Sequence, residues 1–152
     1  MTQTYFVDSG KHECGFAAFW DQHLTAARLI CSCTPIMQDC RTTEPTHVYC
    51  EIPQVYAFGK GKGDPADLIA LALAAGTVTA GLPRTFVTPA QWKGQIPETV
   101  MNDRMLAALT PPELAILEAC TASRAKKKPK GRGHMQDVYV AVAMGLKHHG
   151  RI

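Results

Sequence analysis

The apolar positions of the first fifty residues fall in short runs that are typical of β-strands. Tyr5, Phe6 and Val7 are aromatic or β-branched, and they lead directly into Asp8 and a Ser-Gly turn. Further strands are predicted over 15–20, 24–33 and 47–51, and the last of these ends on Glu51. A buried carboxylate is costly unless it is paired or binds a metal. Two acids at strand ends therefore need an explanation, although Asp8 could simply open the turn.

The second half of the chain follows helical spacing. Asp64 and Pro65 are typical of a helix start, and the helix predicted over 68–75 is apolar nearly all round and should end at Gly76 and Gly81. A fifth strand is predicted over 84–87. Helices are predicted from 97 to 109, from a capping box at 110–113 to about 122, and from 134 to 149. This order predicts an α/β fold, a mixed five-stranded sheet flanked by helices, in one domain over 1–152.

Charge is distributed unevenly along a chain of 152 residues whose formal net charge is +3. Cations gather in two loops that contain glycine or proline. Such clusters favour a phosphate-rich partner, although solvated charge runs are as common. The clustered cations are Lys60 and Lys62 in the first loop and Arg124, Lys126, Lys127, Lys128, Lys130 and Arg132 in the second.

Cysteine usage and hydropathy exclude two classes of protein. The six cysteines contain no Cys-x-x-Cys pair, so they fit reduced thiols of a cytoplasmic protein better than a zinc site. The longest uncharged run, 68–83, is shorter than the roughly 20 residues that a membrane span needs. We therefore expect no membrane partner.

Five motifs, taken in their order and spacing, resemble the RuvC-type Holliday junction resolvases of the ribonuclease H-like superfamily. They are VDSG at 7–10, CEIPQVY at 50–56, GDPADLI at 63–69, WKGQIP at 92–97 and HMQD at 134–137. The chain is most similar to compact versions from bacteriophages and bacterial genomes. The resemblance extends from residue 5 to about 150.

The resemblance implies a homodimeric endonuclease that uses Mg²⁺ or Mn²⁺, with no small-molecule cofactor, and nicks two strands of a four-way DNA junction. The residues that would hold two metal ions are Asp8, Glu51, Asp137 and His134. Lys93 matches a basic residue near the scissile phosphate, and Arg104 could add another. Tyr56 and Phe58 lie where the family places an aromatic wedge, although one of them could pack on the core. Lys60, Lys62, Lys126, Lys127, Lys128, Lys130 and Arg132 complete the expected DNA contacts.

The chemistry of these residue types agrees with that implication. Phosphodiester hydrolysis is well served by two divalent ions about 3.5–4 Å apart, which take oxygen ligands. His134 and Asp137 are three residues apart and share a helix face, and an imidazole ligand would favour Mn²⁺. Simpler roles remain open: Asp137 could offset the helix dipole, and His134 and Trp92 could be packing residues. Lys93 could be solvated, while Asp64 and Asp67 fit helix capping better than metal binding.

Two functional classes follow from this sequence. The first is a metal-dependent nuclease that resolves Holliday junctions, or a looser nuclease for branched or flapped DNA, in recombination or repair. The second is a junction-binding protein of the same fold without nuclease activity. The apolar 68–75 helix predicts a two-fold homodimer in either case.

Overall fold

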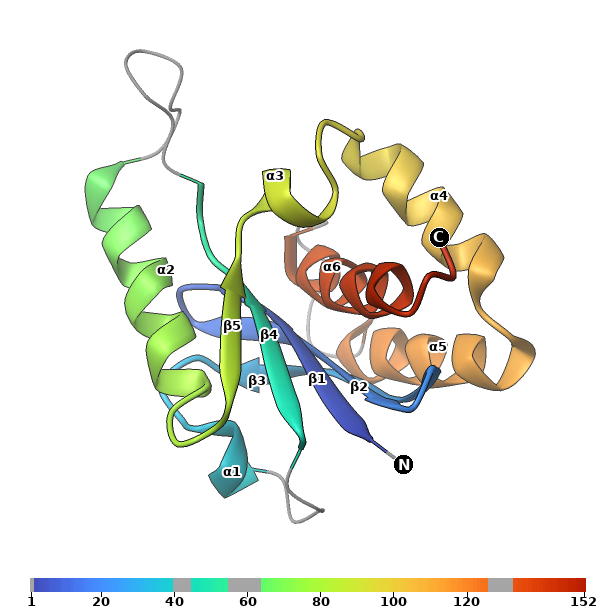
Figure 1. Ribbon diagram of the computed structural model, residues 1–152, viewed down its shortest axis with the longest axis horizontal. Coiled ribbons are helices and arrows are strands. Elements are labelled where there is room, and N and C mark those ends of the chain that lie inside the picture. The colour runs from blue at the N-terminus through green and yellow to red at the C-terminus, as the bar shows by residue number, and fades with distance from the viewer. Residues whose placement is uncertain (1, 40–44, 55–63, 126–132) are drawn as a thin grey trace.

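A mixed five-stranded sheet forms the centre of the computed structural model, which describes residues 2–39, 45–54, 64–125 and 133–152 (Figure 1). The strand order is β3-β2-β1-β4-β5. The first three strands form an antiparallel meander, and β4 and β5 lie parallel to β1. The strands are β1 Gln3–Asp8, β2 Glu13–Trp20, β3 His23–Cys31, β4 His47–Glu51 and β5 Arg84–Val87. The predicted fold class is confirmed.

Helices cover both faces of the sheet (Figure 1). They are α1 Ile36–Asp39, α2 Pro65–Val78, α3 Pro89–Trp92, α4 Glu98–Ala108, α5 Pro111–Ala125 and α6 Gly133–His148. The first two pack on one face, and α4, α5 and α6 pack on the other. Among the described residues, no helix combines the length and the apolar character that crossing a membrane requires.

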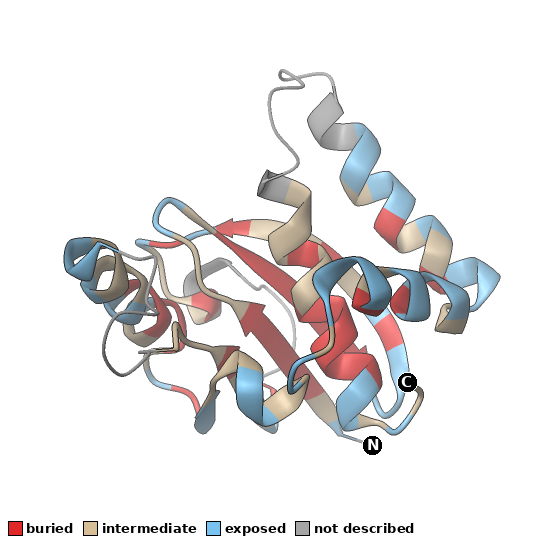
Figure 2. Ribbon diagram, turned by 90° about the horizontal axis from the view of Figure 1, so that it is seen from above, coloured by how far each residue is buried: buried red, intermediate tan, exposed pale blue. Residues whose placement is uncertain are grey.

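Successive side chains of a strand point to opposite faces of the sheet, so the protein has one hydrophobic core on each face. On β1, Phe6 faces the helices α4, α5 and α6, while Tyr5 and Val7 face α1 and α2. All three side chains are buried. Figure 2 shows buried positions concentrated along the central strands and α6. The sheet therefore holds β1 and α6, which carry two of the candidate acids, in rigid surroundings.

One prediction about local structure was wrong, and one helix was not predicted at all. Gly76 does not end α2, because Ala75 and Val78 bury themselves on the sheet and the helix continues to Val78. The roughly 1 kcal/mol that glycine costs inside a helix is smaller than the gain from that packing. The single-turn helix α3 was not predicted, because four residues are too few to show a helical period.

The first turns of α2 and α5 contain side-chain contacts at the residues from which the sequence predicted these helix starts. The Asp64 carboxylate accepts a hydrogen bond of 2.9 Å from the Ala66 N–H, which confirms it as the N-cap of α2. Asp67 forms an ion pair with Lys11 on the surface. The Glu113 carboxylate accepts from the Thr110 N–H at 2.8 Å, which is one of the two hydrogen bonds of a capping box, and also from the Thr110 hydroxyl at 2.9 Å.

Glu113 also anchors the C-terminal end of the chain, which the sequence did not predict. The Arg151 guanidinium donates to both Glu113 carboxylate oxygens at 2.6 and 2.7 Å and to the Ala108 carbonyl at 2.7 Å. The Leu24 N–H donates to the same carboxylate at 2.9 Å. Only 3% of Glu113 is exposed, so one buried ion pair joins α4, α5, β3 and the C-terminus.

Candidate active site

Two acids meet where the parallel strands β1 and β4 end. Asp8 and Glu51 are the last pair of the β1–β4 ladder. Residues two apart on a strand share a face, so Asp8 lies on the side of Phe6 and Glu51 on the side of Tyr49. The rings of Phe6 and Tyr49 are stacked with centroids 5.4 Å apart, in the core beneath α6. Both carboxylates therefore belong to the face that α6 covers.

A glycine lets α6 bring the third acid to this edge. Gly15 on β2 pairs with Asp8, and a Cβ atom at Gly15 would overlap the carbonyl oxygen of Asp137. Helix and sheet thus approach closely enough for the Asp137 and Asp8 carboxyl groups to share a hydrogen bond. The motifs implied that these acids share one site, but the part played by Gly15 was not predicted, although a glycine inside a strand is a signal of close backbone approach.

Burial raises the pKa values of Asp8 and Glu51, and repulsion from neighbouring carboxylates adds to the rise at Asp8. Burial first, and then the negative charges of Glu51 and Asp137, raise the pKa of Asp8 well above its usual range, and Lys93 opposes the rise. Burial also raises the pKa of Glu51, against the opposing effects of Trp92 and Lys93. Three carboxyl groups at one point are stable together only with a proton or a cation among them.

Trp92 and Lys93 approach the acids from α3 and its C-cap. The Trp92 indole N–H donates a hydrogen bond to a carboxylate oxygen of Glu51, and the Lys93 ammonium lies 5.6 Å from the centroid of the Trp92 ring. Trp92 also packs against the core, which confirms the simpler role considered for it, but its hydrogen bond to Glu51 was not predicted. The signal was available, because a half-buried indole N–H usually finds an acceptor.

The architecture matches solved structures of a known kind. RuvC of Thermus thermophilus superposes with a TM-score of 0.52 at 14% identity, over 96% of this chain and 92% of that chain. The chain has a RuvC-like fold. A structure of T. thermophilus RuvC in complex with Holliday junction substrate matches with a TM-score of 0.49 at 14% identity, over 97% of this chain and 92% of that one. No model of a known protein family matches the chain, and no curated protein matches its sequence.

Other predicted site residues of this RuvC-like fold are not brought to the acids by the described structure. His134 lies in the first turn of α6, but its side chain is outside the described part. Arg104 is exposed on α4. The remaining expected DNA contacts lie outside the described residues: Tyr56, Phe58, Lys60, Lys62, Lys126, Lys127, Lys128, Lys130 and Arg132. Their roles stay predictions.

The chemistry of the donors decides whether a metal fits. No group of three or more His, Cys, Asp or Glu side chains within the described ranges is arranged to hold a metal ion. The donors are nevertheless carboxylate oxygens, which hard divalent cations prefer. The Asp8–Asp137 hydrogen bond keeps a proton between two acids, and the repulsion between Asp8 and Glu51 would be relieved by a divalent charge. The carboxylate oxygens of Asp8, Glu51 and Asp137 are therefore ligands of the chemical type that Mg²⁺ or Mn²⁺ binds.

Proposed function

We propose that the protein is a divalent-metal-dependent endonuclease that cuts branched DNA, and four-way junctions in particular. The convergence of Asp8, Glu51 and Asp137 at one edge of the sheet carries this proposal. The likeness of the fold to that of Thermus thermophilus RuvC supports the same proposal. The resemblance in motifs supplies the substrate class.

In this proposal the side chains have separate tasks. Asp8, Glu51 and Asp137 hold Mg²⁺ or Mn²⁺, with His134 as a further ligand. The metal would supply an activated water and charge stabilisation at the scissile phosphate. Trp92 orients the Glu51 carboxylate through its indole N–H. Lys93 contributes a positive charge beside the carboxylates, where a phosphate would also lie.

The test is cleavage of a synthetic four-way junction in Mg²⁺, in Mn²⁺ and in a chelator, with linear duplex of the same sequence as control. We expect paired nicks near the branch point with either metal and none in the chelator. Cleavage that persists in the chelator, or equal cleavage of the linear duplex, would contradict the proposal.

A second candidate is a junction-binding protein without nuclease activity. It is favoured by the lack of a ready-made metal-holding arrangement among the described side chains. Tight junction binding with no nick in either metal would select it. The presence of all three acids argues against it, because a site without a catalytic task has no reason to keep half-buried carboxyl groups whose charges oppose one another.

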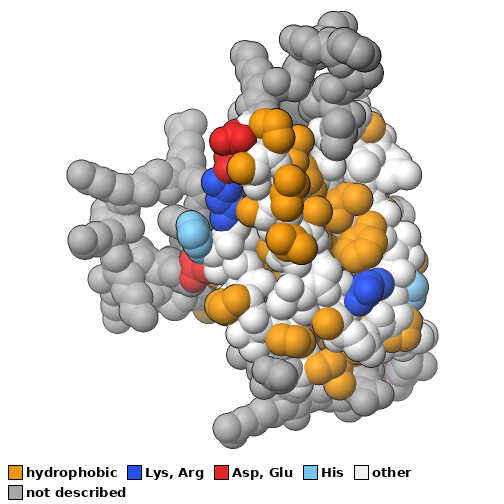
Figure 3. All heavy atoms as spheres, turned by 90° about the vertical axis from the view of Figure 1, so that its left-hand side faces the viewer, with side chains coloured by type: hydrophobic (Ala, Val, Ile, Leu, Met, Phe, Trp, Pro, Cys, Tyr) orange, Lys and Arg blue, Asp and Glu red, His pale blue; other side chains and the backbone are white. Residues whose placement is uncertain are grey.

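The apolar outer face of α2 supports the proposal that two copies associate. Ile69 and Leu73 lie one turn apart on this helix, and 62% and 67% of their surfaces are exposed. Figure 3 shows hydrophobic side chains gathered on the side of the molecule that α2 presents. A two-fold dimer through this face would place two active sites on symmetry-related strands of one junction.

Leu73→Glu is expected to convert the dimer to a monomer, because it places two charges in an apolar two-fold contact. Light scattering at assay concentration measures the mass, and paired nicking should fall to single nicks. Val100→Glu is the matched control, since Val100 is an exposed apolar residue on α4. A wild-type protein that is monomeric and still makes paired nicks would rule the dimer out.

Trp92→Phe is expected to lower the cleavage rate about 10- to 100-fold, the usual cost of losing a group that orients a metal ligand. The Trp92 hydrogen bond lowers the pKa of Glu51, so its loss should raise that pKa and move the acidic limb of the pH–rate profile upward. The measurement is single-turnover cleavage against pH. An unchanged profile with a lower rate would mean that Trp92 acts through packing alone.

A further inference from the structure

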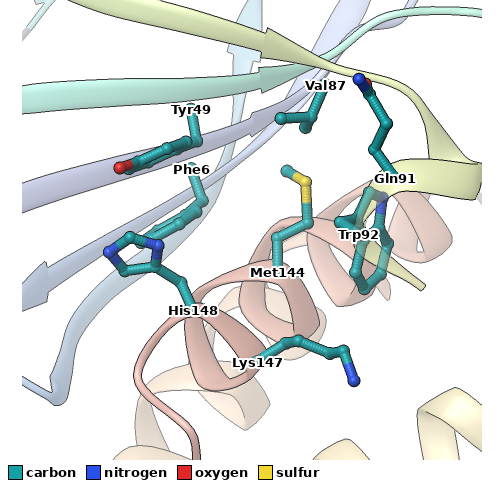
Figure 4. A pocket seen from close by; sticks show the side chains of 8 residues that line it. All are labelled: Phe6, Tyr49, Val87, Gln91, Trp92, Met144, Lys147 and His148. Atoms are coloured by element: carbon teal, nitrogen blue, oxygen red, sulfur yellow. The ribbon is translucent and has the colours of Figure 1, made fainter.

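A cavity of about 290 Å³ lies directly beside the candidate active site. It is an open pocket bordered by the sheet, α3 and α6 (Figure 4). Small-molecule pockets usually measure about 300–1,000 Å³, so this cavity suits a single small ring system. Nothing in the proposed cleavage chemistry uses it.

The walls are flat, aromatic and largely apolar. Phe6, Tyr49 and His148 group at one end, Gln91 and Trp92 stand at the other, and Met144 rises from α6 between them (Figure 4). The Tyr49 and His148 ring centroids are 4.5 Å apart. Burial and the neighbouring His47 lower the pKa of His148, which favours the neutral form of its ring. Such walls favour a planar heteroaromatic ring over an aliphatic chain.

Charged residues lie at the cavity and at the neighbouring site of proposed cleavage: Lys147, Lys93 and the acid Glu51. Trp92 lines the cavity and also donates its indole N–H to Glu51. Lys147 lines the cavity as well, and Lys93 lies 5.6 Å from the Trp92 ring. An occupant with a flat ring and an attached negative charge fits this surrounding best. A nucleotide has both features.

We propose that this cavity receives one unpaired nucleobase of the DNA strand whose phosphate lies at the carboxylates. The inference rests on the proposed function and adds the way in which the substrate is recognised. Moving a base out of a duplex costs a few kcal/mol, and least when the base is already unpaired. The cavity therefore favours DNA in which a base next to the cut is unpaired or easily unpaired, as at a branch point.

The first test removes a single base from the DNA and leaves the protein unchanged. A junction is prepared with one abasic nucleotide at each position near the branch point in turn, and its affinity is measured without divalent metal. We expect one position to weaken binding about 5- to 150-fold, the equivalent of the roughly 1–3 kcal/mol that one stacked base contributes. If no position weakens binding more than about twofold, the proposal is wrong.

A variant that fills the cavity makes the result specific. Val87 lines the cavity, and Val87→Phe should weaken binding of the intact junction and remove the effect of the abasic nucleotide. Val100→Phe is the matched control, because Val100 is exposed on α4 and should behave as wild type. A full abasic effect in Val87→Phe would overturn the proposal, and melting temperatures check that both variants fold.

A fluorescence measurement separates this inference from the proposed function. The chain has two tryptophans, so Trp20→Phe leaves Trp92 as the sole reporter. A single-stranded trinucleotide should quench Trp92 more than the same molecule with an abasic centre. That difference is expected even if no junction is cleaved, and equal quenching would reject the pocket while leaving the nuclease proposal intact.

Discussion

Asp8→Asn is expected to abolish junction cleavage and, at the same time, to stabilise the metal-free protein. Burial and the negative charges of Glu51 and Asp137 raise the pKa of Asp8 well above its usual range. Losing one stabilising electrostatic group in an active site commonly costs about 10²–10³-fold in rate. Losing a ligand of the proposed metal should cost at least this much. Junction binding should be kept or improved, because a negative charge near phosphate is removed.

The stability effect follows from the raised pKa of Asp8. The folded protein binds the Asp8 proton more tightly than the unfolded chain, whose aspartates have a pKa near 3.9. Stability is therefore full below that value and falls as pH rises through the folded-state pKa. An asparagine carries no such penalty. In a chelator, Asp8→Asn should melt at a higher temperature than wild type at pH 7 and lose this advantage near pH 3.

Melting curves with and without Mn²⁺, run beside the cleavage assay, test both effects. Metal should stabilise the wild type and have little effect on Asp8→Asn. The control is Asp103→Asn, since Asp103 is exposed on α4 and should leave cleavage unchanged. Wild-type cleavage by Asp8→Asn would remove Asp8 from the ligand set.

Arg151→Met is expected to lower the free energy of unfolding by about 3–5 kcal/mol. This is the usual cost of removing one partner of a buried ion pair. Glu113 would remain buried with its charge unpaired, although Leu24 and Thr110 would still donate to it. For a chain of this size the melting temperature should fall by about 6–20 °C. Cleavage should persist below the new melting temperature, since the pair lies outside the candidate active site.

The pH dependence of this effect has a defined sign. Burial alone would raise the pKa of Glu113, but the hydrogen bonds from Arg151, Thr110 and Leu24 lower it to about 2. The pair therefore contributes stability above the unfolded pKa of about 4.3, and this contribution is lost as pH falls through about 2. The difference in the free energy of unfolding between the wild type and Arg151→Met should therefore become smaller as pH falls over that range.

Two variants control for the Arg151 prediction. Arg84→Met removes an arginine that is exposed on β5 and should cost far less. Glu113→Gln combined with Arg151→Met should recover much of the loss, because no buried charge is left. If the double variant is no more stable than Arg151→Met, the unpaired charge is not the cause.

Local signals in the sequence determined the strands, the acids at their ends and the helix starts. The apolar runs before Asp8 and Glu51 predicted strand ends, and β4 and β5 have the predicted bounds. Asp64 and the Thr110–Glu113 capping box act within one helical turn of their partners. Such contacts involve neighbours in the chain, so the residue types alone indicate them.

Only the tertiary structure decided how distant residues meet: the motifs implied that Asp137 joins Asp8 and Glu51, but not the contacts that bring them together. Gly15 admits α6 so that Asp137 reaches Asp8, and Trp92 donates to Glu51 from 41 residues away. Arg151 reaches Glu113 across 38 residues, and the packing of Ala75 and Val78 carries α2 past Gly76. Each of these depends on how closely two elements approach. That distance is set by the shape of the whole core, which no local pattern of residues records.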